Sequence, residues 1–212
     1  LVGTIDGGNH TFNRLTSDGD IVKFAKDDIT VGSIGTDASF YIDGATAQAG
    51  LQFRASDIVP RDNGALVDNT VDLGDTSYRF NDVYAGNGVT TTSDATEKQD
   101  ILALTATEML VAARISKLFK TFRWIDAVEE KGVNARIHSG TMAQDVQSAF
   151  TVEGLDAGRY SLFISSTWFV DAEGNVVEEG TEGAVSKTRM GLRYSELMSF
   201  VAAYNEQRFA SI

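Results

Sequence analysis

The chain has 212 residues, of which 42% are hydrophobic and 23% charged, so it can bury a core. Its formal net charge of −12 argues against proteins that track a nucleic-acid backbone or an anionic membrane surface. Cysteine is absent, which excludes disulfides and thiolate chemistry, and two histidines, His10 and His138, are too few for a histidine-rich zinc site. No apolar stretch approaches the roughly 18 residues of a membrane-spanning helix. We therefore expect no metal, no other cofactor, no nucleic acid and no membrane insertion.

Residues 1–92 differ in composition from the rest of the chain, because they hold 12 of the 20 glycines and no glutamate, methionine or tryptophan. Short alternating runs separated by turn residues are typical of all-β structure; they are DIVKF (20–24), ITVGSI (29–34), SFYID (39–43) and LQFRA (51–55). Few of these runs carry enough apolar side chains to close a core alone. We expect residues 1–92 to be a β-rich segment that buries its apolar face against other copies of itself. The stretches DGD (18–20) and KDD (26–28) are candidates for calcium, but turns between strands explain them well.

Residues 93–212 change to helical periodicity. Apolar residues recur at helical spacing in three segments, and helices are expected over 100–120, 141–150 and 194–209. Strands are expected between them, at FRWI (122–125), RYSLFIS (159–165), TWFVD (167–171) and TRMGLRY (188–194), with a hairpin turn at DAEGN (171–175). The expected fold is mixed: a β-rich segment, residues 1–92, followed by an α+β domain with long helices and its own core.

A series of spaced motifs surrounds the junction of the two halves. VDLGDTSYRFNDVYAGNGVTTTSD (71–94) carries Leu73-Gly74, Arg79-Phe80, Asp82-Val83-Tyr84 and Ser93-Asp94, and Lys98 follows. Further along stand HSGTMAQDV (138–146) and the terminal YSELMSFVAAYNEQ. In this order and spacing, the motifs resemble the self-cleaving C-terminal intramolecular chaperone of phage tail fibres and endosialidase tailspikes. The resemblance covers most of 71–212, whereas residues 1–70 are similar only in style.

The resemblance implies a chaperone domain, residues 93–212, that brings three chains together and guides the folding of a β-rich fibre tip, residues 1–92. Release would follow from self-cleavage of the Thr92–Ser93 bond, with Ser93 as nucleophile and Lys98 as its base; Asp94 and His138 are candidates for supporting roles. The implied partners are further copies of the chain, the upstream fibre or spike shaft, and a host-surface glycan or receptor. The implied location is the virion tail, with the chaperone part made in the host cytoplasm and released on maturation.

The proposed chemistry places demands on Ser93 and Lys98. A serine hydroxyl is a poor nucleophile until a base takes its proton, and a lysine does so only if its pKa lies well below its usual value of about 10.4. Positions i and i+5 of one α-helix lie about 140° apart, so the two side chains cannot converge on a helix. We expect Ser93 on extended or turn backbone and Lys98 on the first helical turn, or Lys98 from a neighbouring chain. If Glu97 approaches Lys98, it would raise the lysine's pKa and slow the cut.

Other interpretations remain open. Without the flanking motifs, Ser93 or Asp94 would be an ordinary helix N-cap. A second function is an uncleaved structural or receptor-binding fibre tip with a permanent trimerisation cap. A glycan-cleaving enzyme ranks third, because the thirteen aspartates of residues 1–92 form no convincing catalytic pair. His138 beside Ser139 fits a packing role better than a hydrolase pair, and Trp124 and Trp168 fit buried anchors better than a sugar site.

Overall fold

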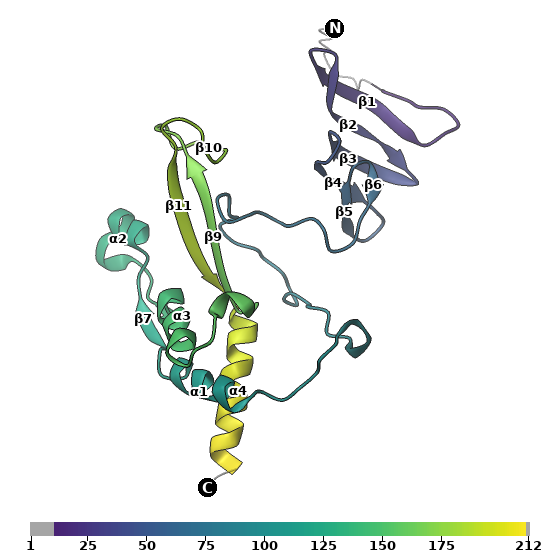
Figure 1. Ribbon diagram of the computed structural model, residues 1–212. Helices are drawn as coiled ribbons and strands as arrows, with labels where there is room; N and C mark the ends of the chain where they lie inside the picture. Colours follow the sequence, from purple (N-terminus) through teal and green to yellow (C-terminus); the bar gives the residue numbers. More distant parts are fainter. Residues whose placement is uncertain (1–10, 211–212) are drawn as a thin grey trace. The chain divides into compact units, whose positions relative to one another are not determined.

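The computed structural model of the chain describes residues 11–210, so His10 and the rest of LVGTIDGGNH lie outside the described residues (Figure 1). Two compact units share the chain, one ending at Asp75 and the other beginning at Thr76. The expected boundary between residues 92 and 93, which rests on the predicted cleavage point, stays a prediction. Within the described residues, no helix is both long and apolar enough to cross a membrane.

The first unit is an antiparallel sheet whose strands follow one another in chain order (Figure 1). Its strands are β1 (Gly19–Lys26), β2 (Ile29–Asp37), β3 (Ser39–Gly44), β4 (Ala49–Phe53), β5 (Ile58–Asp62) and β6 (Ala65–Leu66). The four alternating runs are confirmed as β1 to β4. Asp27 and Asp28 of the KDD stretch lie at the β1–β2 turn with φ values of 52° and 61°, a left-handed conformation that aspartate tolerates in turns.

The two faces of this sheet differ sharply in polarity. The register pairs Phe40 with Phe53 and Ile42 with Leu51 on one face, and Tyr41 with Gln52 on the other. The apolar face is open: Phe40, Ile42 and Leu51 are 48%, 46% and 45% exposed. The polar face is closed over by its own side chains, since Tyr41, Asp43, Gln52 and Arg61 are all buried. Within the described residues of this unit, the face that the hydrophobic effect would bury is therefore left uncovered.

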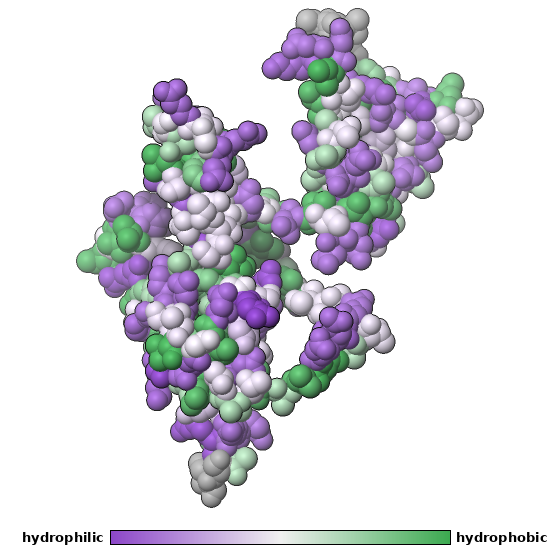
Figure 2. Space-filling model, viewed as in Figure 1, coloured by the Kyte–Doolittle hydropathy of each residue, from purple (hydrophilic) through white to green (hydrophobic). Residues whose placement is uncertain are grey.

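The second unit has a conventional apolar core. It contains α1 (Ala106–Ile115), α2 (Ile125–Lys131), α3 (Ala143–Val152) and α4 (Tyr194–Ala210), with the pair β7 (Lys120–Phe122) and β8 (His138–Gly140) and a sheet of β10 (Val176–Val177), β9 (Phe163–Val170) and β11 (Val185–Leu192). Its three short 3-10 helices are η1 (Ala95–Glu97), η2 (Gly132–Asn134) and η3 (Ala157–Arg159). The core lies where α1, α3 and α4 meet the start of β9, around Ile115, Phe150 and Leu197, each 0% exposed. Apolar residues also reach the surface of both units (Figure 2).

Several expected elements differ in extent. The helix expected over 100–120 begins only at Ala106, because Thr105 and Glu108 form a capping box there. The strand expected at FRWI ends at Phe122, and Trp124 caps α2, which the sequence analysis did not anticipate. TWFVD falls largely within β9, whereas only the last three residues of RYSLFIS lie in that strand. Only α4, with 17 residues, is long; α1 and α3 have 10 each.

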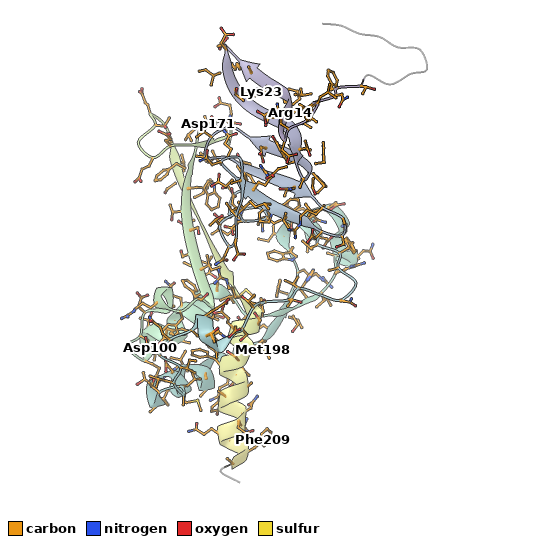
Figure 3. All side chains as sticks on the ribbon, turned by 90° about the vertical axis from the view of Figure 1, so that its right-hand side faces the viewer. Arg14, Lys23, Asp100, Asp171, Met198 and Phe209 are labelled. Carbon is orange, nitrogen blue, oxygen red and sulfur yellow. The ribbon has the colours of Figure 1, made fainter. Side chains whose placement is uncertain are left out.

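Other expectations are confirmed. TMAQDVQSAF contains most of α3, and the terminal helix is α4. DAEGN forms the turn between β9 and β10, where the Asp171 carboxylate accepts hydrogen bonds from the N–H groups of Glu173 and Asn175 (Figure 3).

Candidate functional site

A single capped turn separates Ser93 from Lys98. The turn is η1, and the Asp94 carboxylate oxygen Oδ1 accepts hydrogen bonds of 2.8 Å from both the N–H and the hydroxyl of Thr96. These bonds, first from the backbone and then from the hydroxyl, lower the pKa of Asp94. Asp94 and Lys98, which flank the turn, both have extended backbones. The chain thus reverses over three residues, and Asp94 holds the reversal in place.

The reversal brings the two proposed catalytic side chains together. Lys98 Nζ donates a hydrogen bond to Ser93 Oγ over 2.6 Å, within one chain. This is the separation that a general base needs from the hydroxyl it activates. Lys98 does not lie on the first turn of an α-helix as expected, because α1 begins only at Ala106. The convergence is made by the 3-10 turn instead.

The pair lies on an open surface. Every residue from 78 to 103 is exposed in the single chain, although this segment carries large apolar side chains: Tyr84, Val89 and Leu102 are 94%, 85% and 86% exposed. A lysine acts as a base when its surroundings disfavour the charged ammonium. In the described chain, both Ser93 and Lys98 are open to solvent.

His138, the second candidate for a supporting role, lies in an aromatic cluster. Its ring stacks on Phe122, with centroids 5.7 Å apart, and meets Trp124 edge-on at 6.3 Å. These contacts favour the packing role for His138. Trp124 is 54% exposed, so the expectation that it is a buried anchor was wrong. Trp168 is partly buried, and the Arg189 guanidinium lies 5.0 Å from the centre of its ring.

Glu108 is a positioning residue that the sequence analysis missed. Its Oε2 accepts a 2.6 Å hydrogen bond from the N–H of Thr105, and its Oε1 accepts one of 2.9 Å from the Tyr160 hydroxyl. The N–H of Thr105 is the main cause of a lowered pKa for Glu108. Glu108 therefore fixes the point where the segment that follows Lys98 enters the folded core. The sequence T-x-x-E at 105–108 was the available signal.

The described residues contain no group of three or more histidine, aspartate or glutamate side chains that could hold a metal ion. In particular, Asp20 of the DGD stretch accepts a 2.8 Å hydrogen bond from the Tyr41 hydroxyl. This bond is the main cause of a lowered pKa for Asp20.

Comparison with known proteins shows what this fold and junction resemble. Residues 93–155 match the family described as chaperone of endosialidase. The probable tail spike protein of Klebsiella phage 0507-KN2-1 is 33% identical over 169 residues, which cover 71% of this chain and 14% of that protein. The side tail fiber protein pb1 of Escherichia phage T5 is 32% identical over 162 residues, or 71% of this chain and 12% of that protein.

A solved structure supports the same assignment. The carboxy-terminal domain of the bacteriophage T5 L-shaped tail fiber, with its intramolecular chaperone domain, superimposes with a TM-score of 0.58 and 27% identity over 87% of this chain and 49% of that one. The match to the chaperone-of-endosialidase family is confined to residues 93–155. It resembles the C-terminal end of phage tail spikes and fibres, and it spans less than a quarter of the length of the curated relatives it matches.

Proposed function

We propose that residues 93–212 assemble three copies of this chain, guide the folding of the upstream β-rich segment, and are then released by cleavage of the Thr92–Ser93 bond. The observation that carries the proposal is the 2.6 Å hydrogen bond from Lys98 Nζ to Ser93 Oγ across the turn. The match of residues 93–155 to the chaperone-of-endosialidase family supports the chaperone role.

The chemistry follows from the position of Ser93 directly after the bond to be cut. Neutral Lys98 takes the hydroxyl proton while Ser93 Oγ attacks the carbonyl carbon of Thr92. The new C–O bond replaces the C–N bond between residues 92 and 93, and the departing nitrogen of Ser93 takes up a proton to become an amine. Water then hydrolyses the resulting ester, which leaves a carboxylate on Thr92 and restores the serine hydroxyl. The reaction happens once per chain and has no separate substrate.

Assembly is the second part of the proposal, and the open apolar face of the first unit supports it. Within the described residues, one apolar stripe on β1 to β5 is exposed or only partly buried: Val22, Phe24, Ile34, Phe40, Ile42, Leu51, Phe53, Ile58 and Pro60. Packing this face against the identical faces of other copies would bury the apolar side chains of every copy at once. Three copies are what the resemblance of the junction motifs implies.

Assembly and cleavage are linked through the exposure of the junction. Because the segment around Ser93 and Lys98 is open in one chain, a neighbouring copy that covers it would remove water from Lys98 and favour its neutral form. Cleavage then reports that assembly is complete. Intertwined β-structure has many non-local contacts and folds slowly, so a C-terminal module that gathers three chain ends raises their local concentration. After release, a kinetic barrier holds the shaft.

The upstream shaft is the proposed partner, and the tail of the virion is the proposed final location of residues 1–92. Synthesis in the host cytoplasm and binding of a host-surface glycan or receptor stay predictions. The second candidate function is an uncleaved fibre tip with a permanent trimerisation cap. The exposure of Lys98 favours this alternative if no neighbouring chain covers it.

Expression of residues 1–92 alone, beside the full chain and the Ser93→Ala chain, tests the chaperone role. We expect the full chain and Ser93→Ala to give a soluble trimer by light scattering, and the truncated chain to be insoluble or misassembled. If the truncated chain trimerised as well as the full one, residues 93–212 would not be needed for assembly, and the chaperone role would be contradicted. Fragments 1–92 and 93–212 from the wild type, absent from Ser93→Ala, separate the proposal from the permanent cap.

A further inference from the structure

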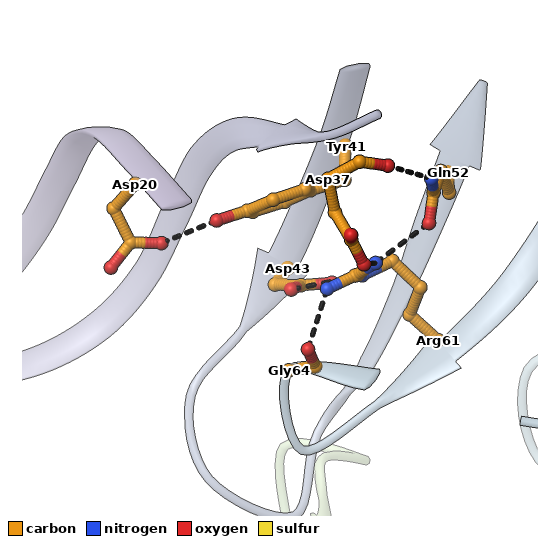
Figure 4. A network of polar contacts seen from close by, with 7 residues as sticks. All are labelled: Asp20, Asp37, Tyr41, Asp43, Gln52, Arg61 and Gly64. Atoms are coloured by element: carbon orange, nitrogen blue, oxygen red, sulfur yellow. Dashed lines mark hydrogen bonds and ion pairs between the residues drawn. The ribbon is translucent and has the colours of Figure 1, made fainter. Parts of the chain in front are cut away.

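Arg61 lies at the centre of a polar network on the closed face of the first unit's sheet (Figure 4). Its side chain is 2% exposed. From β5, its Nε donates to Asp43 on β3 over 2.8 Å and 3.1 Å to the two carboxylate oxygens. Its Nη1 donates to Gln52 Oε1 on β4 over 2.7 Å. One side chain thus contacts two strands besides its own.

The remaining contacts of Arg61 reach the β5–β6 turn, β2 and the Tyr41 ring. Its Nη2 donates to the carbonyl oxygen of Gly64 in the β5–β6 turn over 2.6 Å, and its Nη1 lies 3.3 Å from Asp37 Oδ2 at the end of β2. The guanidinium also lies 4.3 Å from the centre of the Tyr41 ring, on β3. The planar fork of an arginine can satisfy such a set only when every partner is in its proper place.

Gly50 makes the connection from β5 to β3 sterically feasible. In the β4–β5 register Gly50 lies opposite Arg61. A Cβ added at Gly50 would come within 2.3 Å of Asp43 Oδ1, a distance that carbon and oxygen do not tolerate. The ion pair of Arg61 and Asp43 therefore passes over the one residue of β4 that has no side chain. Its neighbours on the same face, at positions 48 and 52, are both glutamine.

The apolar face cannot by itself select this alignment. A one-residue slip of a strand moves its apolar residues to the opposite face, but a two-residue slip returns them to the same face. A two-residue slip of β3 against β4 would place Ile42 opposite Phe53 instead of its native partner Leu51, and both pairs are apolar. On the polar face, the same slip would move the Asp43 carboxylate away from the Gly50 gap and from Arg61.

We propose that Arg61, Asp43 and the Gly50 gap form a register lock that rejects two-residue slips of this sheet. A buried ion pair contributes little net stability relative to apolar residues of similar size, so its value here lies in specificity. The lock acts within one chain and is independent of the proposed cleavage. It gives the β-rich segment a means of fixing its strand alignment before its apolar face is covered.

The absence of cysteine from the chain allows a direct test with disulfide trapping. In the full Ser93→Ala chain, the pair Ile42→Cys/Leu51→Cys reports the native register, and the pair Ile42→Cys/Phe53→Cys reports the two-residue slip. Each pair is combined with Arg61→Met/Asp43→Leu, which removes both charges, and separately with Gly50→Ala. Intrachain disulfides are counted by peptide mass mapping after mild oxidation.

We expect the slipped-pair disulfide to increase about tenfold in both lock variants relative to the chain with an intact lock. The control is Arg54→Met, which removes an exposed ion pair with Asp57 at 2.5 Å and should leave both disulfides unchanged. If the double variant does not fold, Arg61→Lys takes its place, because lysine keeps the charge but not the fork. Folded lock variants whose slipped-pair yield stays at the level of the intact lock would overturn the proposal.

Discussion

Lys98 Nζ lies 2.6 Å from Ser93 Oγ across one 3-10 turn, and both residues are exposed in the single chain. The hydrogen bond between the two side chains therefore has a different origin from the water-free environment that the proposed cleavage needs. The turn that joins the two side chains is local and forms within the chain, whereas in the proposed function another copy covers Lys98 and removes water from it. Under the proposed function, this separation would keep Ser93 and Lys98 from cutting the Thr92–Ser93 bond before assembly.

The cap on the turn should matter to the rate of cleavage. Asp94→Ala removes the acceptor of both Thr96 hydrogen bonds, so the turn loses its preferred shape and cleavage should slow about tenfold. Asp94→Asn keeps one oxygen in the same position and should cleave close to the wild-type rate. Gln99→Ala, an exposed change outside the turn, is the control. Equal rates for Asp94→Ala and wild type, measured by gel densitometry, would exclude a positioning role for Asp94.

The apolar face of the first unit should be an interface between copies. Ile42→Asp places a charge at the centre of that face, where burial in a trimer would leave it unpaired. We expect light scattering to show loss of the trimer or a trimer that dissociates on dilution. Lys23→Ala changes the polar face, where Lys23 pairs with Asp20 at 3.3 Å, and should leave the trimer intact. A stable Ile42→Asp trimer would place the interface elsewhere.

Removing only one partner of the buried ion pair should be costly. Arg61→Met leaves the Asp43 carboxylate, 8% exposed, without its main partner, and we expect a loss of about 3–5 kcal/mol in the free energy of unfolding. The double change Arg61→Met/Asp43→Leu should recover most of that loss. Urea unfolding in the Ser93→Ala background gives both values. If Arg61→Met alone lowered the free energy of unfolding no more than the double change does, the Arg61–Asp43 pair would not be desolvated in the assembled protein.

Acid should weaken the cap of α1. The pKa of Glu108 is lowered from its usual 4.5 by the N–H of Thr105, the hydroxyl of Thr105 and then that of Tyr160. A lowered folded-state pKa contributes stability that is complete above pH 4.5 and is lost as the pH falls through the folded value. We expect Glu108→Gln, which keeps a capping side chain, to reduce the drop in unfolding free energy between pH 7 and pH 3. An unchanged drop would show that Glu108 titrates normally.

Local patterns predicted much of this fold because they depend on neighbours in sequence. The alternation in SFYID identified β3, and the apolar stripe of YSELMSFVAAYNEQRF identified α4. The spacing of Ser93 and Lys98 correctly excluded a shared helix, but it did not predict that Asp94 would cap a 3-10 turn between them. That turn depends on the hydrogen bonds that Thr96 donates to the Asp94 carboxylate, and many Asp-x-Thr sequences do not form such bonds.

Other features depended on distant residues and were not predictable from one sequence. The partners of Arg61 come from four separate parts of the first unit, and only the strand register brings them together. Helix α2 was missed because aromatic and β-branched residues at 122–125 favour a strand locally, whereas the chain after Phe122 turns into a helix capped by Trp124.

The time course of intact mass for freshly purified wild type, Ser93→Ala and Lys98→Arg tests the central claim most directly. Arginine keeps the positive charge of Lys98 but cannot give up a proton to act as a base. The account predicts two fragments, residues 1–92 and 93–212 with Ser93 as a new N-terminus, from the wild type alone. A single uncut mass for the wild-type trimer would contradict it, and so would fragments in the Lys98→Arg protein.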